Sequence, residues 1–366
     1  MLIGIEAERA NHPEKTGVEH YAKQLILQLA ELDQKNQYIL YLRTKPEDWF
    51  LKLPENFKVK ILGYGPIPFP YLWTQIRLSF EMLISAPDVL FIPAASLPLF
   101  HPKKSIVTVH DTAWKIYPET FTVLKRWYLE FTAWFACKYA YKIIAVSQAT
   151  KEDLLKFYGV PETQVQVVYH GFETAARSAG SVSPELLRKL PQDYILSLGT
   201  IQPRKNTTGL IDAFLQLKHE HPELPHKLVV AGKVGWKPEE TLHRMDHPEI
   251  LYLGHVKDDE RWYLLGHATV YALPSFYEGF GMPILEAFAS GTPVVTSNVS
   301  SMPEVAGNAA VYCDPANVRD IKQALQSVLF DARLRQALVE NGTKRLLEFS
   351  WEKCARETLA VFTTHE

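Results

Sequence analysis

The sequence predicts an α/β protein of two domains, each built on a doubly wound parallel β-sheet with helices on both faces. The chain has 366 residues, of which 47% are hydrophobic, whereas a single hydrophobic core usually stops growing at roughly 250 to 300 residues. Short apolar segments also alternate with amphipathic segments in two successive series. Buried parallel strands separated by helices produce this alternation.

The first series predicts strands at LIGI, YILYL, VKIL, DVLFIP, SIVTVH and KIIAVS, with a helix at GVEHYAKQLILQLAEL. The second predicts strands at YILSLGT, HKLVVAG, ILYLGHV, ATVYALPS, TPVVTS and AAVYCD. Residues 169–187 between them are rich in Gly, Ser and Ala, which predicts a linker. We therefore expect domains over residues 1–175 and 185–349, facing a central cleft where loops from the carboxyl ends of the strands converge.

Composition excludes several classes of function. The 39 basic and 41 acidic residues give a formal charge of -2, which does not provide the broad positive field that nucleic-acid binding needs. The three cysteines have neither disulfide-framework nor zinc-site spacing, which favours a reducing cytosol. There is no DxD triplet and no Asp, His or Cys cluster with the spacing of metal ligands, so we expect no metal and no other cofactor.

The segment SFYEGFGMPILEAFASGTPVV, residues 275–295, predicts a helix that begins near Met282 and ends at Gly291. Pro283 suits a first helical turn, where its missing N–H costs nothing. A glycine after the last turn suits a left-handed end position. We expect free backbone N–H groups of residues 281–284 to face an anion such as a phosphate.

Two glutamates flank this helix start. Glu278 lies in the loop before it and Glu286 lies a turn deeper in the helix. The pair could accept hydrogen bonds from sugar hydroxyls at the two ends of a bound sugar nucleotide. The alternative is a solvated Glu278 and a Glu286 that merely sits where helices favour acids; from the glutamates alone, this second interpretation is the simpler one.

A counter-charge for a phosphate is offered by LSLGTIQPRKN, where a strand ends at Gly199 and Arg204 and Lys205 open the next helix. Arginine can bind two phosphate oxygens at once, and lysine acts as a mobile point charge. These two cations therefore suit a diphosphate. An ordinary solvated turn is the alternative.

The first domain offers two more candidates. Gly17 lies just before a predicted helix, where a glycine lets the backbone approach a ligand. His110 and Asp111 end the strand SIVTV, at the sheet edge where ligands bind in such folds. A histidine that only forms structural hydrogen bonds is the alternative.

On these motifs the sequence resembles the retaining glycosyltransferases of family 4, which have the two-Rossmann-domain GT-B fold. The resemblance covers nearly the whole chain. It rests chiefly on the two glutamates with seven residues between them, within PSFYEGFGMPILEAFASGTPVVTSNVSSMPEVAGNAAVYCDP. TGVEHY, VHD, VSQATKEDL, VVYHGF and GTIQPRKN also match.

The resemblance implies that Glu278 contacts the hydroxyls of the transferred sugar and Glu286 the ribose of the nucleotide. Arg204 and Lys205 would bind the diphosphate, with Arg204 replacing an arginine that the family often has where this chain has Thr200. The catalytic set is then Glu278, His110, Arg204 and Lys205, with His110 near the reacting carbon. The implied nucleotide-sugar contacts are Gly17, Gly199, Arg204, Lys205, Val256, Glu278, Gly279, Phe280, Gly281, Met282, Pro283, Leu285 and Glu286.

The resemblance further implies that a C-terminal helix over residues 350–366 crosses back to complete the first domain; a last helix on the second domain is the alternative. The expected activity is retaining, metal-independent transfer of a hexose from a nucleotide diphosphate sugar to a glycan, lipid-linked or small-molecule hydroxyl. GDP-mannose is the first expected donor and a UDP-hexose the second.

Other classes of function stay open at this point. A nucleotide-sugar epimerase could use the same fold, and a non-catalytic sugar-nucleotide-binding module could keep the same pocket. An oxidoreductase is disfavoured because no GxGxxG follows the first strand.

The expected location is the cytoplasm, because the sequence begins without a secretory h-region and has no run near 20 apolar residues. Residues 66–83 and 120–142 combine aromatic residues with scattered cations. They are interpreted either as a face for peripheral contact with the inner side of the cytoplasmic membrane or a lipid-linked acceptor, or as core stripes of ordinary helices.

Overall fold

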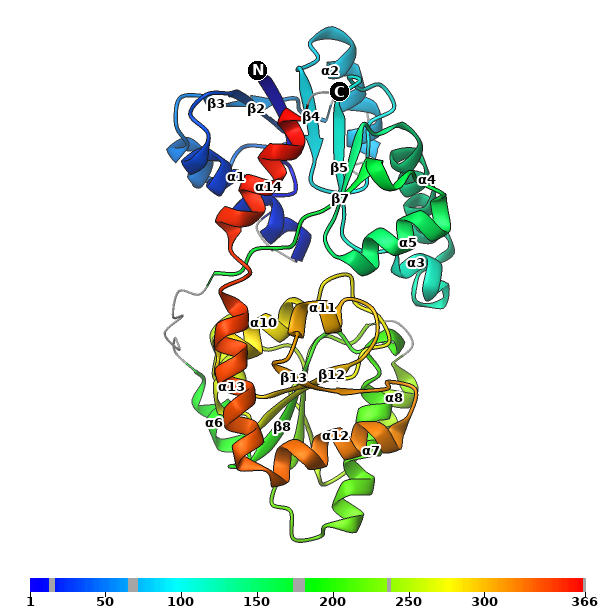
Figure 1. Ribbon diagram of the computed structural model, residues 1–366, viewed down its shortest axis with the longest axis vertical. Coiled ribbons are helices and arrows are strands. Elements are labelled where there is room, and N and C mark those ends of the chain that lie inside the picture. The colour runs from blue at the N-terminus through cyan, green and yellow to red at the C-terminus, as the bar shows by residue number, and fades with distance from the viewer. Residues whose placement is uncertain (13–16, 65–71, 174–181, 236–237, 365–366) are drawn as a thin grey trace. The chain divides into compact units, whose positions relative to one another are not determined.

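The computed structural model describes residues 1–12, 17–64, 72–173, 182–235 and 238–364. The chain forms two compact units (Figure 1). Unit 1 comprises Met1–Ile116, Thr122–Gly171 and Phe349–Glu366, and unit 2 comprises Tyr117–Phe121 and Phe172–Glu348. Apart from the short segment Tyr117–Phe121, the chain passes from unit 1 to unit 2 at residues 171–172, near the predicted domain boundary, and returns to unit 1 at residues 348–349. Each unit is described by itself below.

Unit 1 contains a parallel sheet with the strand order β3-β2-β1-β4-β5-β6-β7. Its strands are β1 (Leu2–Glu6), β2 (Gln37–Leu42), β3 (Phe57–Ile61), β4 (Val89–Ile92), β5 (Ser105–Val109), β6 (Lys142–Ala145) and β7 (Val165–Val167). The first six follow the predicted apolar runs. The strand β7 was not predicted, because three residues are too few to show a period.

The helices of unit 1 cover both faces of this sheet. They are α1 (Gly17–Leu32), α2 (Ser79–Ile84), α3 (Ala113–Ile116), α4 (Val123–Tyr139), α5 (Gln148–Tyr158) and α14 (Trp351–Thr363). A π-helical turn, Thr74–Leu78, leads directly into α2. One core cluster joins the sheet to α1 and α14, and another lies between the sheet and the α2 and α4 side.

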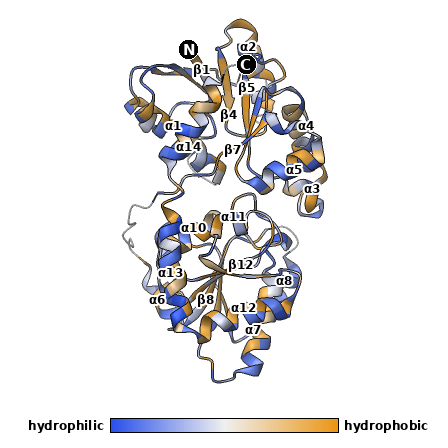
Figure 2. Ribbon diagram, viewed as in Figure 1, coloured by the Kyte–Doolittle hydropathy of each residue, from blue (hydrophilic) through white to orange (hydrophobic). Residues whose placement is uncertain are grey.

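Unit 2 contains a second parallel sheet with the order β10-β9-β8-β11-β12-β13. Its strands are β8 (Tyr194–Leu198), β9 (Lys227–Ala231), β10 (Ile250–Tyr252), β11 (Val270–Leu273), β12 (Val294–Ser297) and β13 (Ala310–Cys313). They all follow the second predicted series. In Figure 2 strands such as β4 and β8 are largely orange, whereas the helices mix orange and blue, as expected for sheets covered on both faces.

The helices of unit 2 are α6 (Pro184–Lys189), α7 (Thr207–Glu220), α8 (Glu239–Met245), α9 (Asp258–His267), α10 (Met282–Ala289), α11 (Met302–Ala306), α12 (Val318–Phe330) and α13 (Ala332–Leu346). In both sheets, successive strands are first added on one side of the first strand and then on its other side. The direction changes between β1 and β4 and between β8 and β11. Ligands of doubly wound sheets bind beside such a change, at the carboxyl ends of the strands.

The predicted linker over residues 169–187 contains the passage between the units at residues 171–172, but its described ends are packed or helical. His170 and Phe172 are buried, and α6 already begins at Pro184; residues 174–181 lie outside the described part of the chain. A Cβ atom on Gly171 would lie only 2.3 Å from the Cα of Trp351. The small residue therefore reflects close packing against the start of α14 rather than a flexible connection.

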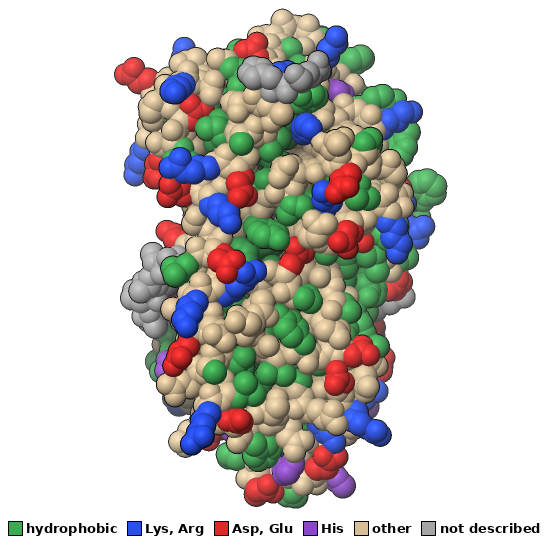
Figure 3. All heavy atoms as spheres, viewed as in Figure 1, with side chains coloured by type: hydrophobic (Ala, Val, Ile, Leu, Met, Phe, Trp, Pro, Cys, Tyr) green, Lys and Arg blue, Asp and Glu red, His purple; other side chains and the backbone are tan. Residues whose placement is uncertain are grey.

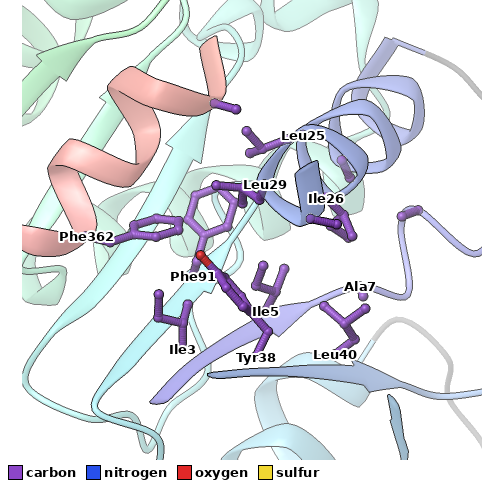
Figure 4. Close-up of a cluster of buried hydrophobic side chains, with 14 of the residues drawn as sticks. Ile3, Ile5, Ala7, Leu25, Ile26, Leu29, Tyr38, Leu40, Phe91 and Phe362 are labelled. Carbon is purple, nitrogen blue, oxygen red and sulfur yellow. The ribbon is translucent and has the colours of Figure 1, made fainter. Parts of the chain in front are cut away.

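Helix α14 packs into unit 1, beside α1. Its buried positions recur at helical spacing and include Trp351, Cys354, Ala355, Thr358 and Phe362. Figure 4 shows the Phe362 ring directed toward Phe91 of β4, with the two ring centroids 5.0 Å apart. The last helix of the chain thus supplies part of the first hydrophobic core.

We predict that Phe362→Ala lowers the free energy of unfolding by about 3–5 kcal/mol, because the cavity left by a buried phenylalanine refills only in part. Phe362 is 1% exposed. The effect is measured by urea unfolding of the full chain, with Leu347→Ala, at a position that is 80% exposed, as control. Superimposable unfolding curves for Phe362→Ala and the wild type would show that α14 does not contribute to this core.

Candidate functional site

The candidate site lies on the two loops that follow the adjacent strands β8 and β11. The β8 loop carries Arg204 and Lys205 in a short 3₁₀ turn, and the β11 loop carries Glu278. The Phe276 N–H donates a 2.8 Å hydrogen bond to the Arg204 carbonyl oxygen. The neighbouring strands thus bring Glu278 to two cations that lie 73 and 74 positions before it in the sequence.

The carboxylate of Glu278 binds both cations. Lys205 Nζ lies 2.5 Å from Oε1, and Arg204 Nη1 lies 3.0 Å from Oε2. Arg204 Nη1 also donates to the carbonyl oxygen of Tyr277 at 2.8 Å, and the Ser275 hydroxyl donates to Oε1 at 2.8 Å. The side chain of Glu278 is only 9% exposed, and those of Arg204 and Lys205 are 17% and 14% exposed.

The interpretation of Glu278 as a solvated loop residue is therefore wrong. Burial by itself raises the pKa of this carboxyl group, but the charges and hydrogen bonds of Lys205, Arg204 and Ser275 outweigh burial and lower its pKa to about 2. At neutral pH the site therefore holds an ionised carboxylate that is almost completely shielded from solvent.

The backbone around Glu278 is also fixed. Its carbonyl oxygen accepts hydrogen bonds from the hydroxyls of Ser300 and Ser301 at 2.6 and 2.8 Å. Asn206 adopts a left-handed conformation with φ 54°, and its side-chain amide donates to the Pro315 carbonyl oxygen at 2.7 Å. Both loops are thus held to neighbouring parts of unit 2, which orients the three charged side chains before any ligand binds.

Helix α10 follows the β11 loop. It begins at Met282, with Gly281 at φ 101° before it and Pro283 in its first turn. The Gly291 that follows the helix has φ 69°, as the sequence predicted. Figure 1 shows α10 and α11 together at one end of the unit 2 sheet.

The expectation of free N–H groups throughout residues 281–284 is corrected. Pro283 has no N–H, and the Ile284 N–H donates to the Gly281 carbonyl oxygen at 2.9 Å. The amides that this helix start can direct at an anion are therefore those of Gly281 and Met282. Gly279 before them is partly exposed, and Phe280 is 5% exposed.

Glu286 lies on α10 and pairs with Arg261 of α9. Arg261 Nη1 is 2.7 Å from the Glu286 Oε1 atom, and the other terminal nitrogen, Nη2, is 3.4 Å from Asp258. The Glu286 side chain is 12% exposed. Next to it in the helix, Leu285 is 0% exposed, so the structure gives its side chain no surface for the nucleotide contact that was expected.

Glycine allows the loops beside the cations to approach closely. Gly199 has φ 143°, and a Cβ atom there would lie 3.6 Å from Lys205 Cε. A Cβ on Gly232, which follows β9, would lie 1.8 Å from the Gly199 carbonyl oxygen. Thr200 is exposed, and Val256 is partly exposed in the loop between β10 and α9.

In unit 1, both ring nitrogens of His110 have partners. Nε2 lies 2.9 Å from the Pro93 carbonyl oxygen and Nδ1 lies 3.4 Å from His170 Nε2. Burial lowers the pKa of His110, and burial followed by the charges of His110 and His20 lowers the pKa of His170 well below its usual value. His110 is therefore a neutral imidazole fixed by its hydrogen bonds, which agrees with the alternative of a histidine that only forms structural hydrogen bonds.

Gly17 is the first residue of α1, and a Cβ atom placed on it would meet nothing within 4 Å. The structure therefore brings Glu278, Arg204 and Lys205 into direct contact and places Glu286 on the neighbouring helix. His110 and Gly17 belong to the other unit.

Sequence reasoning missed Arg261, Ser275, Ser300, Ser301 and Asn206. Arg261, Ser300 and Ser301 lie more than 20 residues from the glutamates that they contact, so no local spacing identifies them, whereas Ser275 lies only three residues before Glu278. The run SNVSS after β12 was a usable signal, because clustered hydroxyls at the carboxyl end of a strand commonly bind loop backbone. Among the described residues, no group of three His, Cys, Asp or Glu side chains could hold a metal ion.

Comparison with known proteins agrees with this geometry. Residues 182–345 match the family model for glycosyl transferases group 1, and residues 15–176 match that for glycosyltransferase family 4. The O-antigen chain mannosyltransferase B of Escherichia coli is 31% identical over 71% of this chain and 70% of its own length. A serotype-specific mannosyltransferase WbdA of the same species is 28% identical over 60% of this chain, but only 28% of its own length.

Solved structures share the fold. HepE of Anabaena, determined in complex with UDP and glucose, superposes with a TM-score of 0.70 at 17% identity, over 100% of this chain and 99% of its own. The sucrose-phosphate synthase of Thermosynechococcus elongatus gives 0.73 at 18% identity, over 99% and 98%. The chain has the GT-B fold and belongs to the group 1 glycosyltransferases of glycosyltransferase family 4.

Proposed function

We propose that this glycosyltransferase moves mannose from GDP-mannose to a hydroxyl group of a glycan, lipid-linked or small-molecule acceptor. The transfer retains the anomeric configuration and uses no metal ion. The observation that carries the proposal is the buried Glu278 carboxylate held by Arg204 and Lys205 at the direction change of the unit 2 sheet. Two cations at this position suit the diphosphate of a sugar nucleotide.

Mannose is favoured by the names of several relatives. Besides the O-antigen enzymes, the MMP alpha-(1->4)-mannosyltransferase of Mycolicibacterium hassiacum is 30% identical over 60% of this chain and 53% of its own length. A UDP-hexose is the second candidate donor, because HepE was solved with UDP and glucose. That structure supports the fold and not the choice of base.

The donor diphosphate and Glu278 compete for the same cations. Without donor, Arg204 and Lys205 neutralise the carboxylate; when a diphosphate binds, its oxygens draw Lys205, whose four-carbon side chain is flexible. Glu278 Oε1 then accepts hydrogen bonds from hydroxyls of the donor sugar. Donor binding thus places the sugar against a carboxylate that was masked before.

The two cations also stabilise the charge that develops on the leaving diphosphate. In the proposed step, the bond between the anomeric carbon and the phosphate oxygen breaks while the acceptor oxygen bonds to the same carbon on the same face. The acceptor proton passes to the departing phosphate oxygen. Glu278 stabilises the positive charge on the sugar and does not attack it, unlike the nucleophile of a retaining glycosidase.

Glu286, oriented by Arg261, is proposed to accept hydrogen bonds from the ribose of the nucleotide. His110 is proposed to contact the donor sugar as a neutral imidazole, because burial lowers its pKa. We place the protein in the cytoplasm, since Cys137, Cys313 and Cys354 are free and buried and a reducing compartment keeps such thiols intact.

GDP-mannose is expected to raise the Tm more than UDP-, ADP- or TDP-sugars, because a ligand that binds only the folded state stabilises it by mass action. A thermal-shift screen measures this.

With the preferred donor, NMR of the product is expected to show the donor's anomeric configuration, and EDTA is expected to leave the rate unchanged. An inverted product or full loss of activity in EDTA would each contradict the mechanism, and an epimerised sugar formed without acceptor would contradict transfer itself.

Lys205→Ala is expected to weaken GDP binding by about 10- to 100-fold, which corresponds to the roughly 1.5–3 kcal/mol of a hydrogen bond to a charged group. Isothermal titration calorimetry measures the Kd. Lys189→Ala is a matched control, because this lysine lies on α6 and its side chain is 56% exposed. Equal affinity of Lys205→Ala and wild type for GDP would remove Lys205 from the diphosphate site.

Glu278→Gln is expected to lower kcat by about 10²- to 10³-fold, because a positioned charge in a water-poor site is lost. GDP is expected to bind at least as tightly as to the wild type, since the variant no longer competes for Arg204 and Lys205. Steady-state kinetics and calorimetry separate the two effects. Wild-type kcat, or a large loss of GDP affinity, would show that Glu278 does not have the proposed role.

The same variant has a pH signature. Folding lowers the pKa of Glu278 from 4.5 to about 2, which corresponds to about 3 kcal/mol of stability. A depressed carboxyl pKa stabilises the fold above the unfolded-state pKa and loses this effect as the pH falls through the folded-state pKa. The difference in unfolding free energy between wild type and Glu278→Gln is therefore expected to be constant from pH 7 to about 5 and to shrink toward pH 2.

A further inference from the structure

Helix α4 turns its apolar face outward. Its buried residues are Thr132, Ala133, Ala136 and Cys137, which are small. The exposed face carries Leu124, Trp127, Phe131 and Trp134, which are 85%, 68%, 46% and 44% exposed. These four recur at intervals of three and four residues, so they form one stripe along the helix. A surface helix normally has the opposite arrangement, with its large apolar residues in the core.

The interpretation of residues 120–142 as ordinary core stripes is therefore wrong for these side chains. Figure 3 shows hydrophobic side chains in green, with Lys and Arg in blue beside them, at the edge of the molecule where Figure 1 draws α4. Large exposed apolar patches on a protein mark a surface that another molecule covers.

The stripe continues onto neighbouring segments of unit 1. His101 contacts Phe135 of α4 with ring centroids 6.2 Å apart, and the Phe100 N–H donates to the Ser79 hydroxyl of α2 at 3.2 Å. These contacts join α4, residues 99–101 and α2. We call the exposed side chains on them the apolar surface: Phe80, Leu83, Ile84, Leu99, Phe100, Leu124, Trp127, Phe131 and Trp134, each at least 44% exposed.

The exposed charged side chains in the segments that carry the apolar surface are all positive. Residues 72–84, 99–104 and 122–139 contain two acids, Glu81 and Glu130. The Glu81 side chain is 7% exposed and pairs with Lys60 and Arg77, and Glu130 pairs with Lys115 at 2.6 Å. The exposed cations in these ranges are Lys103, Lys125, Arg126 and Lys138.

Lys138 lies beside the aromatic residues at the end of α4. Its Nζ atom is 5.1 Å from the centroid of a Trp134 ring and 5.3 Å from that of Tyr139. Tryptophan, tyrosine and lysine together are the side chains that prefer the boundary between lipid headgroups and acyl chains.

We propose that the apolar surface of unit 1 docks on an anionic lipid bilayer. The aromatic and aliphatic side chains enter the headgroup boundary, and Lys103, Lys125, Arg126 and Lys138 bind lipid phosphates. No described helix is long and apolar enough to cross a membrane, so the contact is one of a helix lying along the surface. The proposal does not depend on which donor or acceptor the enzyme uses.

Charge argues for lipid over a second copy of the chain. A symmetric dimer places the same patch against itself, which would bring the exposed cations of both copies together while Glu81 and Glu130 stay committed to their own partners. An anionic bilayer supplies the negative charge that this surface lacks.

Flotation of the full-length protein with phosphatidylglycerol–phosphatidylcholine vesicles tests the proposal. We expect the wild type to float with these vesicles and to remain largely unbound with phosphatidylcholine alone. The double variant Leu124→Glu/Trp127→Glu should reduce the vesicle-bound fraction by about tenfold or more, because it replaces two apolar anchors by charges. Both residues are exposed, so an unchanged Tm is expected and confirms that the variant is folded.

Leu347→Glu is the matched control, because Leu347 is 80% exposed and belongs to unit 2. This substitution should leave flotation unchanged. Failure of the wild type to float, or equal flotation of the wild type and the double variant, would overturn the proposal. So would a wild-type dimer that the double variant converts to a monomer in light scattering while neither protein binds vesicles, which would assign the apolar surface to a second copy.

Discussion

The organisation of unit 2 depends on the buried carboxylate of Glu278 and the two cations that share it. An ionised group removed from water costs several kcal/mol unless it is paired and hydrogen-bonded. In the unliganded protein the contacts with Arg204, Lys205 and Ser275 offset this cost. Moving either loop would leave a buried charge without a partner. The pairing therefore fixes both loops and the start of α10 that follows one of them.

The sheet topology explains why these charges meet. Strands β8 and β11 are adjacent but belong to opposite halves of the winding, so the loops that follow them lie side by side at the carboxyl ends, where ligands bind in doubly wound sheets. In unit 1 the first six strands follow the same order and β7 is added at the end, but the chemistry differs. Glu6 ends β1 and is 3% exposed, and burial, only partly opposed by Arg9, raises its pKa to about 7. The same scaffold thus holds a carboxyl group with a lowered pKa in one unit and one with a raised pKa in the other.

Much of the fold could be predicted from the sequence, because buried parallel strands are continuous apolar runs; the strands β1–β6 and β8–β13 were found in this way. The helix start at Met282 followed from Gly281 and Pro283.

The burial of Glu278 could not be predicted, because its partners lie 73 and 74 residues away and only the strand order brings them close. His170 and Gly171 looked like linker residues for the same reason, since the helix that covers them begins at Trp351. The outward stripe of α4 was one of two interpretations that the sequence left open, because helical spacing shows that apolar residues share a face but not which way that face points.

The charge state of Glu278 also limits the chemistry that the site can perform. A carboxyl group with a pKa near 2 has no proton to donate at neutral pH, so it cannot be the general acid of a transfer reaction. In the unliganded site, the cations that lower its pKa also make it a weak base and a weak nucleophile. Glu278 keeps a negative charge that is fixed in place and poorly screened by water. Such a charge stabilises the positive charge that develops on a transferred sugar. In the proposed transfer the acceptor proton therefore passes to the departing phosphate oxygen, which Arg204 and Lys205 are proposed to bind and which gains basicity as its bond to the sugar breaks.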